Sequence, residues 1–265
     1  MANNSRIERL NLYSDFLKKR MGLNIYMPNS YGNHDCFPVL YFLHGRSGSE
    51  NIIFDLDILR SVDALICEKV IKPLIIVCPR LENSRGINSA LTTKVVKSLH
   101  SNGLTINLGR YEDYFIKEVI PFIDRSYKTI NSKKGRFIGG VSAGGYAALN
   151  YGLRYSNLFS KIGGHMPVLE LELDQEDTPY FNTIDIWKKN NPLYIAKECV
   201  ISPDCQIYLD AGNKDEGEFY NGCLELHNIL IDRNITVQNH IFEGHHNIEY
   251  IKSNLEKYLT FYAAS

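Results

Sequence analysis

The sequence lacks the features that would assign it to several specialised classes of protein. Its 265 residues carry 29 basic and 30 acidic side chains, so the formal net charge is −1. This balance, with no basic stripe, argues against a nucleic-acid partner. No run approaches the ~20 consecutive apolar residues that a membrane span needs. Residues 1–20 lack the apolar core of a secretory signal. We therefore expect a cytoplasmic protein with neither a nucleic-acid nor a membrane partner.

The cysteine pattern gives no sign of a metal site. None of the six cysteines forms a C-x-x-C pair, so we predict no zinc and no other metal or cofactor. A chain of this length buries enough apolar surface to fold without a disulfide or a metal. Four cysteines lie in or beside apolar runs, where buried reduced thiols are expected. These four are Cys36, Cys67, Cys78 and Cys205.

Short apolar segments alternate with helical patterns along the chain. Residues 37–43 are apolar at both odd and even positions, which is typical of a strand covered on both faces. Further strands are predicted at 71–78, 136–139, 206–210 and 236–242, with an additional edge strand at 23–27. Helices are predicted at 57–68, 111–125, 142–155, 219–232 and 248–262. This alternation predicts a single α/β domain over residues 1–265, with a mostly parallel sheet and helices on both faces. The active site of such a sheet lies beyond the carboxyl ends of its strands.

The residues 140–144 read G-x-S-x-G, with Ser142 at the centre. A short apolar strand precedes them and a helix rich in small residues follows. Strand, sharp turn and helix is the setting of a nucleophile elbow, in which the serine hydroxyl is exposed at the end of the sheet. Side chains at 140 and 144 would collide with the neighbouring strand and helix, so glycine is expected there. We therefore predict Ser142 as a catalytic nucleophile at a helix N-terminus, where the dipole favours developing negative charge.

A serine nucleophile at such an elbow needs a histidine and an acid that follow it in the chain. Two histidines follow the strand 236–242 directly, and we favour His245 because Gly244 leaves the loop free to aim it. His246 is then expected to be a loop or helix-cap residue. The loop after the strand 206–210 offers Asp215, which we prefer as the acid over Glu216 and Asp210. This aspartate would fix the imidazole tautomer and stabilise the imidazolium.

A glycine-rich loop, residues 44–48, follows the strand 37–43. Such a loop supplies one backbone N–H of an oxyanion hole, and the residue after the nucleophile supplies the other. We assign the two N–H groups to Arg46 and Ala143. His44 precedes the serine in the chain, so we expect it to pack the loop rather than to take part in catalysis.

These motifs resemble those of the putative-esterase family of α/β-hydrolases, and the similarity covers most of the chain. The resemblance rests on four motifs: the strand and loop ending in His44-Gly45, the elbow at 140–148, the acid loop 209–215 and Gly244-His245. The resemblance implies an α/β-hydrolase fold and a Ser142–Asp215–His245 triad. It also places His165 where many members have serine, so His165 is a candidate for contact with the substrate.

The segment 166–204 is too long for a simple strand-to-helix connection, which takes ~2–6 residues plus a helix. We expect it to form a cap-like insertion beside the active site, with Trp187 among the aromatic residues that contact the substrate. The alternative is an ordinary excursion with Trp187 buried in the core. The acidic residues at 170–177 favour a solvated face over a cation site.

The leading functional hypothesis is a serine esterase that cleaves a small to medium ester or thioester through an acyl-enzyme. Acyl transfer to an alcohol would use the same triad, and the sequence does not separate the two. A non-catalytic binding protein on a hydrolase scaffold is the alternative from another class. Such proteins usually lack a member of the triad, whereas this chain offers candidates for all three. The expected partner is a small-molecule ester.

Overall fold

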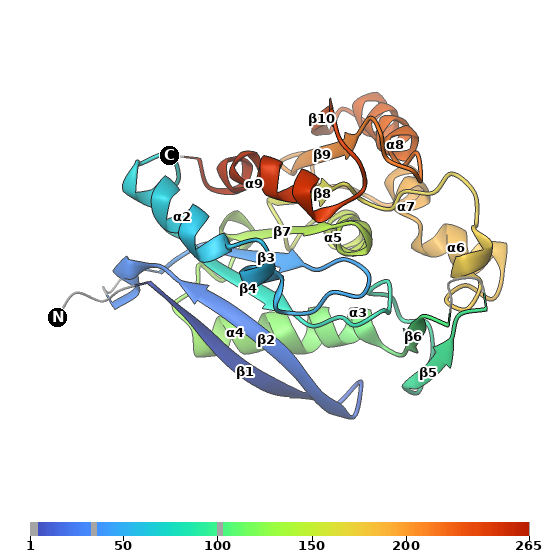
Figure 1. Ribbon diagram of the computed structural model, residues 1–265, viewed down its shortest axis with the longest axis horizontal. Helices are drawn as coiled ribbons and strands as arrows, with labels where there is room; N and C mark the ends of the chain where they lie inside the picture. Colours follow the sequence, from blue (N-terminus) through green and yellow to red (C-terminus); the bar gives the residue numbers. More distant parts are fainter. Residues whose placement is uncertain (1–4, 33–35, 100–102, 265) are drawn as a thin grey trace.

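The computed structural model describes residues 5–32, 36–99 and 103–264. Within these ranges no helix is long and apolar enough to cross a membrane. The described residues form an α/β fold around one large twisted sheet (Figure 1).

The sheet has eight strands in the order β1-β2-β4-β3-β7-β8-β9-β10. Their bounds are β1 (Arg6–Ser14), β2 (Lys19–Met27), β3 (Val39–Leu43), β4 (Ile75–Pro79), β7 (Arg136–Val141), β8 (Lys161–His165), β9 (Gln206–Gly212) and β10 (Thr236–Phe242). The six strands from β4 to β10 in this order pair in parallel, whereas β1 and β2 are antiparallel additions. The predicted mostly parallel sheet is therefore confirmed. The predicted edge strand at 23–27 is part of β2, which is not the edge, because β1 pairs along its whole length.

Helices cover both faces of the sheet because the buried strands present apolar side chains alternately to each face. Leu40 and Phe42 pack in one core with α2 (Ile58–Cys67) and α9 (Ile248–Ala263). Val39, Tyr41 and Leu43 belong to a second core, on the other face. The helices that contribute side chains to this second core are α3 (Tyr111–Tyr114), α4 (Ile120–Ser126), α5 (Ala143–Arg154), α6 (Ile184–Asn190), α7 (Pro192–Glu198) and α8 (Tyr220–Asp232).

The helix expected at 111–125 is observed with an irregular middle. A π-helical turn at Phe115–Val119 joins α3 to α4, and Pro121 lies in the first turn of α4. Proline has no N–H to donate, so it fits beside a π-helical turn that interrupts the regular hydrogen bonding of the helix. Elements not predicted from the sequence include β1, α1 (Ile52–Asp55), α6 (Ile184–Asn190), α7 and the two-stranded sheet of β5 (Lys94–Lys97) and β6 (Thr105–Leu108).

The expectation of buried thiols is wrong for two of the four cysteines. Cys78 and Cys205 are buried, whereas Cys36 and Cys67 are exposed. Cys67 is the last residue of α2, off the face that Ile58, Val62 and Leu65 bury. Sequence proximity to apolar residues therefore did not give the side of the element on which the thiol lies.

Candidate active site

Ser142 lies at a sharp turn between β7 and α5, at the carboxyl edge of the sheet. Its backbone has φ 55° and ψ −119°, a conformation that L-residues rarely adopt. The turn is possible because its glycines allow close backbone approaches. A Cβ at Gly144 would lie 2.3 Å from the carbonyl oxygen of Leu43, and one at Gly140 would lie 2.5 Å from the carbonyl oxygen of Gly144. The strand, sharp turn and helix predicted from G-x-S-x-G are therefore present.

His246 is the histidine that reaches the serine. Its Nε2 lies 2.8 Å from Ser142 Oγ, and its Nδ1 lies 2.8 Å from Asp215 Oδ2. The ring of Phe219 packs edge-on against the imidazole, with 5.4 Å between ring centroids. The imidazole is thus held from two sides, and its Nε2 faces the hydroxyl.

The prediction of His245 as the base is wrong by one position. His245 Nδ1 lies 2.8 Å from Glu216 Oε1, and both side chains are more than half exposed. The backbone N–H of His246 also donates to Glu216, and Asn247 caps α9 by accepting from the N–H of Tyr250. The two adjacent side chains therefore face different partners, His246 toward Ser142 and His245 toward Glu216. The loop contacts therefore fix which histidine faces the serine.

Asp215 occupies the acid position that the sequence analysis favoured over Glu216 and Asp210. Its side chain is fully buried behind His246, and its Oδ1 accepts from the N–H of Gly217 at 2.9 Å. The loops that carry Asp215 and His246 are tied together, since the N–H of Lys214 donates to the carbonyl of Gly244 at 2.9 Å. The acid is therefore held at a fixed distance from the imidazole.

The side chain of His165 is not accessible to a substrate, contrary to expectation. It is fully buried, with its ring stacked on Tyr258 at 3.8 Å between centroids. Its Nδ1 lies 3.3 Å from Asp210 Oδ1, and its Nε2 lies 2.9 Å from the hydroxyl of Tyr262. Burial lowers the pKa of His165. The parallel pairing of β8 and β9 directs this side chain into the core between the sheet and α9.

Asp210 is the centre of this buried network. The hydroxyl groups of Tyr250 and Tyr258 both donate to its Oδ2, at 2.7 and 2.8 Å. Sequence analysis did not identify Tyr250, although it lies four residues after His246. The network connects α9, which begins directly after the histidine loop, to the strand that leads to Asp215.

The loop after β3 lies against the elbow. A Cβ at Gly45 would come within 3.2 Å of Ser142 Cβ, so the loop backbone approaches Ser142 closely. Arg46 and Ala143, the predicted donors of an oxyanion hole, both line the cavity that contains Ser142. His44 packs the loop as expected: it is buried, and its Nε2 accepts from the N–H of Leu81 at 2.9 Å.

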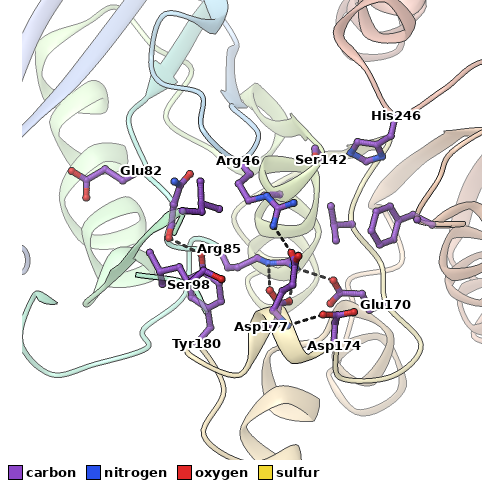
Figure 2. A pocket seen from close by; sticks show the side chains of 18 residues that line it. Arg46, Glu82, Arg85, Ser98, Ser142, Glu170, Asp174, Asp177, Tyr180 and His246 are labelled. Carbon is purple, nitrogen blue, oxygen red and sulfur yellow. Dashed lines mark hydrogen bonds and ion pairs between the residues drawn. The ribbon is translucent and has the colours of Figure 1, made fainter. Parts of the chain in front are cut away.

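A cavity of about 420 Å³ opens beside Ser142 and His246 (Figure 2). Part of its wall comes from the segment 166–204, as expected of a cap-like insertion. Five acidic side chains line it, namely Glu82, Glu170, Asp174, Glu176 and Asp177. The acidic run is thus not simply a solvated face. Arg85 pairs with Asp177 and with Glu170, at 2.8 Å from the latter. This buried cation fixes the segment to the loop after β4.

Trp187 does not contact this cavity, so its predicted role in substrate binding is wrong. Only 1% of its surface is exposed, and its ring packs edge-on against Tyr194. The side chain lies on α6 and faces the core because α7 and α5 pack beneath it. Tyr180 is the aromatic residue of the segment that lines the cavity, and its hydroxyl donates to the carbonyl of Asn83 at 2.8 Å.

A second, smaller cavity of about 210 Å³ also has Ser142 in its lining. Six of its lining side chains are apolar: Ile52, Leu56, Val141, Met166, Ile248 and Ile251. Ser142, Arg46 and His246 line both cavities. Among the residues with described positions, no cluster of three His, Cys, Asp or Glu side chains is arranged to hold a metal ion.

Comparisons with known proteins agree with this architecture. Esterase MT1326 of Mycobacterium tuberculosis (strain CDC 1551 / Oshkosh) is 27% identical over 155 residues, which are 58% of this chain and 30% of that protein. The match therefore spans less than a third of that relative. A solved ferulic acid esterase has a TM-score of 0.81 at 20% identity, with 99% of each chain covered. An S-formylglutathione hydrolase from Agrobacterium tumefaciens has a TM-score of 0.78 at 17% identity, with 99% of this chain and 96% of that chain covered. The family model described as putative esterase matches residues 14–262. The chain thus has the α/β-hydrolase fold and belongs to the putative-esterase family.

Proposed function

We propose that this protein is a serine esterase that hydrolyses carboxylic esters through an acyl-enzyme. The observation that carries the proposal is the chain of two 2.8 Å contacts from Ser142 Oγ through His246 to Asp215. Membership of the putative-esterase family supports the same reaction class. The two cavities beside the serine give the two branches of an ester separate places to bind.

In the proposed first step, Ser142 Oγ attacks the ester carbonyl carbon while His246 Nε2 takes the hydroxyl proton. Asp215 accepts from Nδ1–H, which holds Nε2 as the acceptor and stabilises the imidazolium. The backbone N–H groups of Arg46 and Ala143 stabilise the oxyanion. The C–O bond to the alcohol then breaks, and the alcohol leaves with the proton from His246.

In the proposed second step, His246 takes a proton from water, which attacks the acyl carbon. The bond to Ser142 Oγ breaks, the acid is released, and the proton returns to the serine. The larger cavity favours water as the acceptor, because a roomy cavity with polar walls holds water readily. Acyl transfer to another alcohol would need that alcohol to displace this water.

A fluorophosphonate probe tests the proposal directly. It should label the protein, and peptide mapping should find the modification on Ser142. Ser142→Ala should abolish labelling and lower kcat for p-nitrophenyl acetate by about 10⁶-fold. Ser253→Ala is a matched control, since that exposed serine donates only to the carbonyl of Glu249 in α9. An unlabelled protein, or a Ser142→Ala variant with most of its activity, would refute the proposed function.

A further inference from the structure

The two cavities meet at the nucleophile. Ser142, Arg46 and His246 belong to both linings, and the rest of each lining is different. An ester has two branches at its reacting centre, the acyl chain and the alcohol. A carbonyl carbon placed at Ser142 Oγ therefore sends one branch toward each cavity. The contrast between the two linings decides which kind of branch each cavity accepts.

The larger cavity disfavours anions. Its lining has five acidic side chains and only two basic ones, Arg46 and Arg85. Arg46 already pairs with Glu176 at 2.9 Å, and Arg85 pairs with Glu170 and Asp177 (Figure 2). A substrate carboxylate would face like charges, and each basic side chain of the described lining is already engaged. Placing a substrate carboxylate beside these carboxylates costs binding free energy. A hydroxyl or ammonium group of the substrate can instead donate hydrogen bonds to them.

Two of the acidic groups in this lining, Asp174 and Glu82, can accept further hydrogen bonds. Asp174 is exposed and uses one oxygen to accept from the N–H of Glu176 at 2.7 Å. Glu82 is half-buried and pairs with Lys19 at 2.6 Å. Each carboxylate has room for more than one hydrogen bond. The polar branch therefore meets acceptors along its path from the serine.

The smaller cavity suits an aliphatic chain. Val141, Met166 and Ile251 in its lining are buried, whereas Ile248 is exposed. Placing an aliphatic chain against these side chains removes apolar surface from water on both sides, at roughly 25 cal/mol per Å². Arg46, Asp55 and Asn247 also line this cavity, so the aliphatic chain is expected against its apolar side chains rather than against the whole wall.

Deacylation decides which branch enters which cavity. After the alcohol leaves, water must reach His246 while the acyl chain stays bound. The larger cavity refills with water readily, because its acidic walls offer hydrogen-bond acceptors. An acyl chain in the smaller cavity leaves the larger one free for the hydrolytic water. The reverse arrangement would place the acyl chain where the water must enter.

We propose that the substrate is an ester of a short aliphatic acid with a polar alcohol that carries no negative charge. The acyl chain occupies the apolar cavity, and the alcohol occupies the acidic one. This inference rests on the proposed ester hydrolysis at Ser142 and adds the chemical class of each branch.

Three butyrate esters test the alcohol cavity: butyrylcholine, 2-hydroxyethyl butyrate and butyryloxyacetate. Their alcohol branches are cationic, neutral and anionic. With each kcat/KM divided by the ester's rate of alkaline hydrolysis, the first two should exceed the anionic ester by about tenfold or more at low salt. Asp174→Asn keeps the side-chain oxygen that accepts from the N–H of Glu176. It should lower the ratio of normalised kcat/KM between the cationic and the anionic ester about threefold. Equal or faster cleavage of the anionic ester by the unaltered protein would overturn the inference.

Two isomers test the orientation. 2-Hydroxyethyl butyrate and butyl glycolate have the same atoms but exchange the polar and apolar branches. The normalised kcat/KM should favour 2-hydroxyethyl butyrate by about tenfold. A preference for butyl glycolate would overturn the assignment of the acyl chain to the apolar cavity.

A variant that fills the smaller cavity tests its occupant. Ile248→Trp should lower the butyrate-to-acetate ratio of kcat/KM about tenfold, because the acetyl group needs little of the cavity. Ile231→Trp, at an exposed position on α8, is the control and should leave the ratio unchanged. An unchanged ratio in Ile248→Trp would refute acyl binding there. Fluorophosphonate labelling separates the two proposals: a protein that labels at Ser142 but prefers the anionic ester is an esterase of another specificity.

Discussion

Ser142 Oγ lies 2.8 Å from Nε2 of His246, across 104 residues of sequence. This contact makes His246 the proposed base. His246→Ala should therefore lower kcat toward p-nitrophenyl acetate by about 10⁶-fold, as loss of the histidine does in other triads. His245→Ala is the matched control, because its side chain is exposed and faces Glu216. It should keep activity within about fivefold of the unaltered protein. The opposite ranking, in two variants with unchanged circular dichroism, would contradict the assignment.

The neighbouring residues Asp215 and Glu216 test which carboxylate is the acid of the proposed triad. Asp215→Asn should cost about 10⁴-fold in kcat, because an amide in this position favours the wrong imidazole tautomer. Glu216→Gln alters only an exposed contact with His245, worth about 0–1 kcal/mol. Its kcat should change by no more than a few fold. Comparable losses in the two variants would mean that the loop as a whole, rather than the Asp215 carboxylate, supports activity.

Two tyrosines that donate to the same oxygen provide a test of how the histidine loop is held. Tyr250 and Tyr258 both bond Asp210 Oδ2, and loss of either hydroxyl should cost about 1–3 kcal/mol of unfolding free energy. Only Tyr250 also touches the loop, since a Cβ at Gly244 would lie 2.6 Å from its ring. Tyr250→Phe should therefore lower kcat about tenfold with little change in KM, whereas Tyr258→Phe should lower stability alone. Equal kcat values for the two variants, both shown by urea denaturation to be folded under the assay conditions, would assign both hydroxyls a purely structural role.

The buried acid pair around Arg85 predicts how stability changes with pH. Burial raises the pKa of Glu170 to about 7, although the Arg85 guanidinium beside it acts in the opposite direction. The ordinary pKa of glutamate in an unfolded chain is about 4.3. The folded protein therefore binds this proton more tightly, so the stabilisation is present below pH ~4 and is lost as the pH rises through ~7.

Glu170→Gln should remove this dependence. Urea denaturation at pH values of about 5, 6 and 7 should show a flatter decline in unfolding free energy than in the unaltered protein. Glu172→Gln, at an exposed neighbouring position, should retain the original slope. A steep decline that persists in Glu170→Gln would mean that another group carries the proton.

The sequence by itself determined the α/β architecture, the elbow at Ser142 and the loops that carry the acid and the histidine. These follow from local signals: apolar runs, a glycine-flanked serine, and polar residues directly after strands. Local physics explains each signal, because the backbone at 140 and 144 has no room for a side chain. The preference for Asp215 also depended on local order, since Asp210 is still within β9.

Only the tertiary structure decided which of two adjacent histidines faces the serine. The loop between β10 and α9 is aimed by bonds to Lys214 and Glu216, which are about thirty residues away in the chain. In the same way, the pairing of β8 with β9 buried His165 against Asp210. Helix packing placed Trp187 in the core and left Tyr180 at the cavity. In each case the side chain's direction depends on contacts between distant segments, and residue type and local spacing do not encode those contacts.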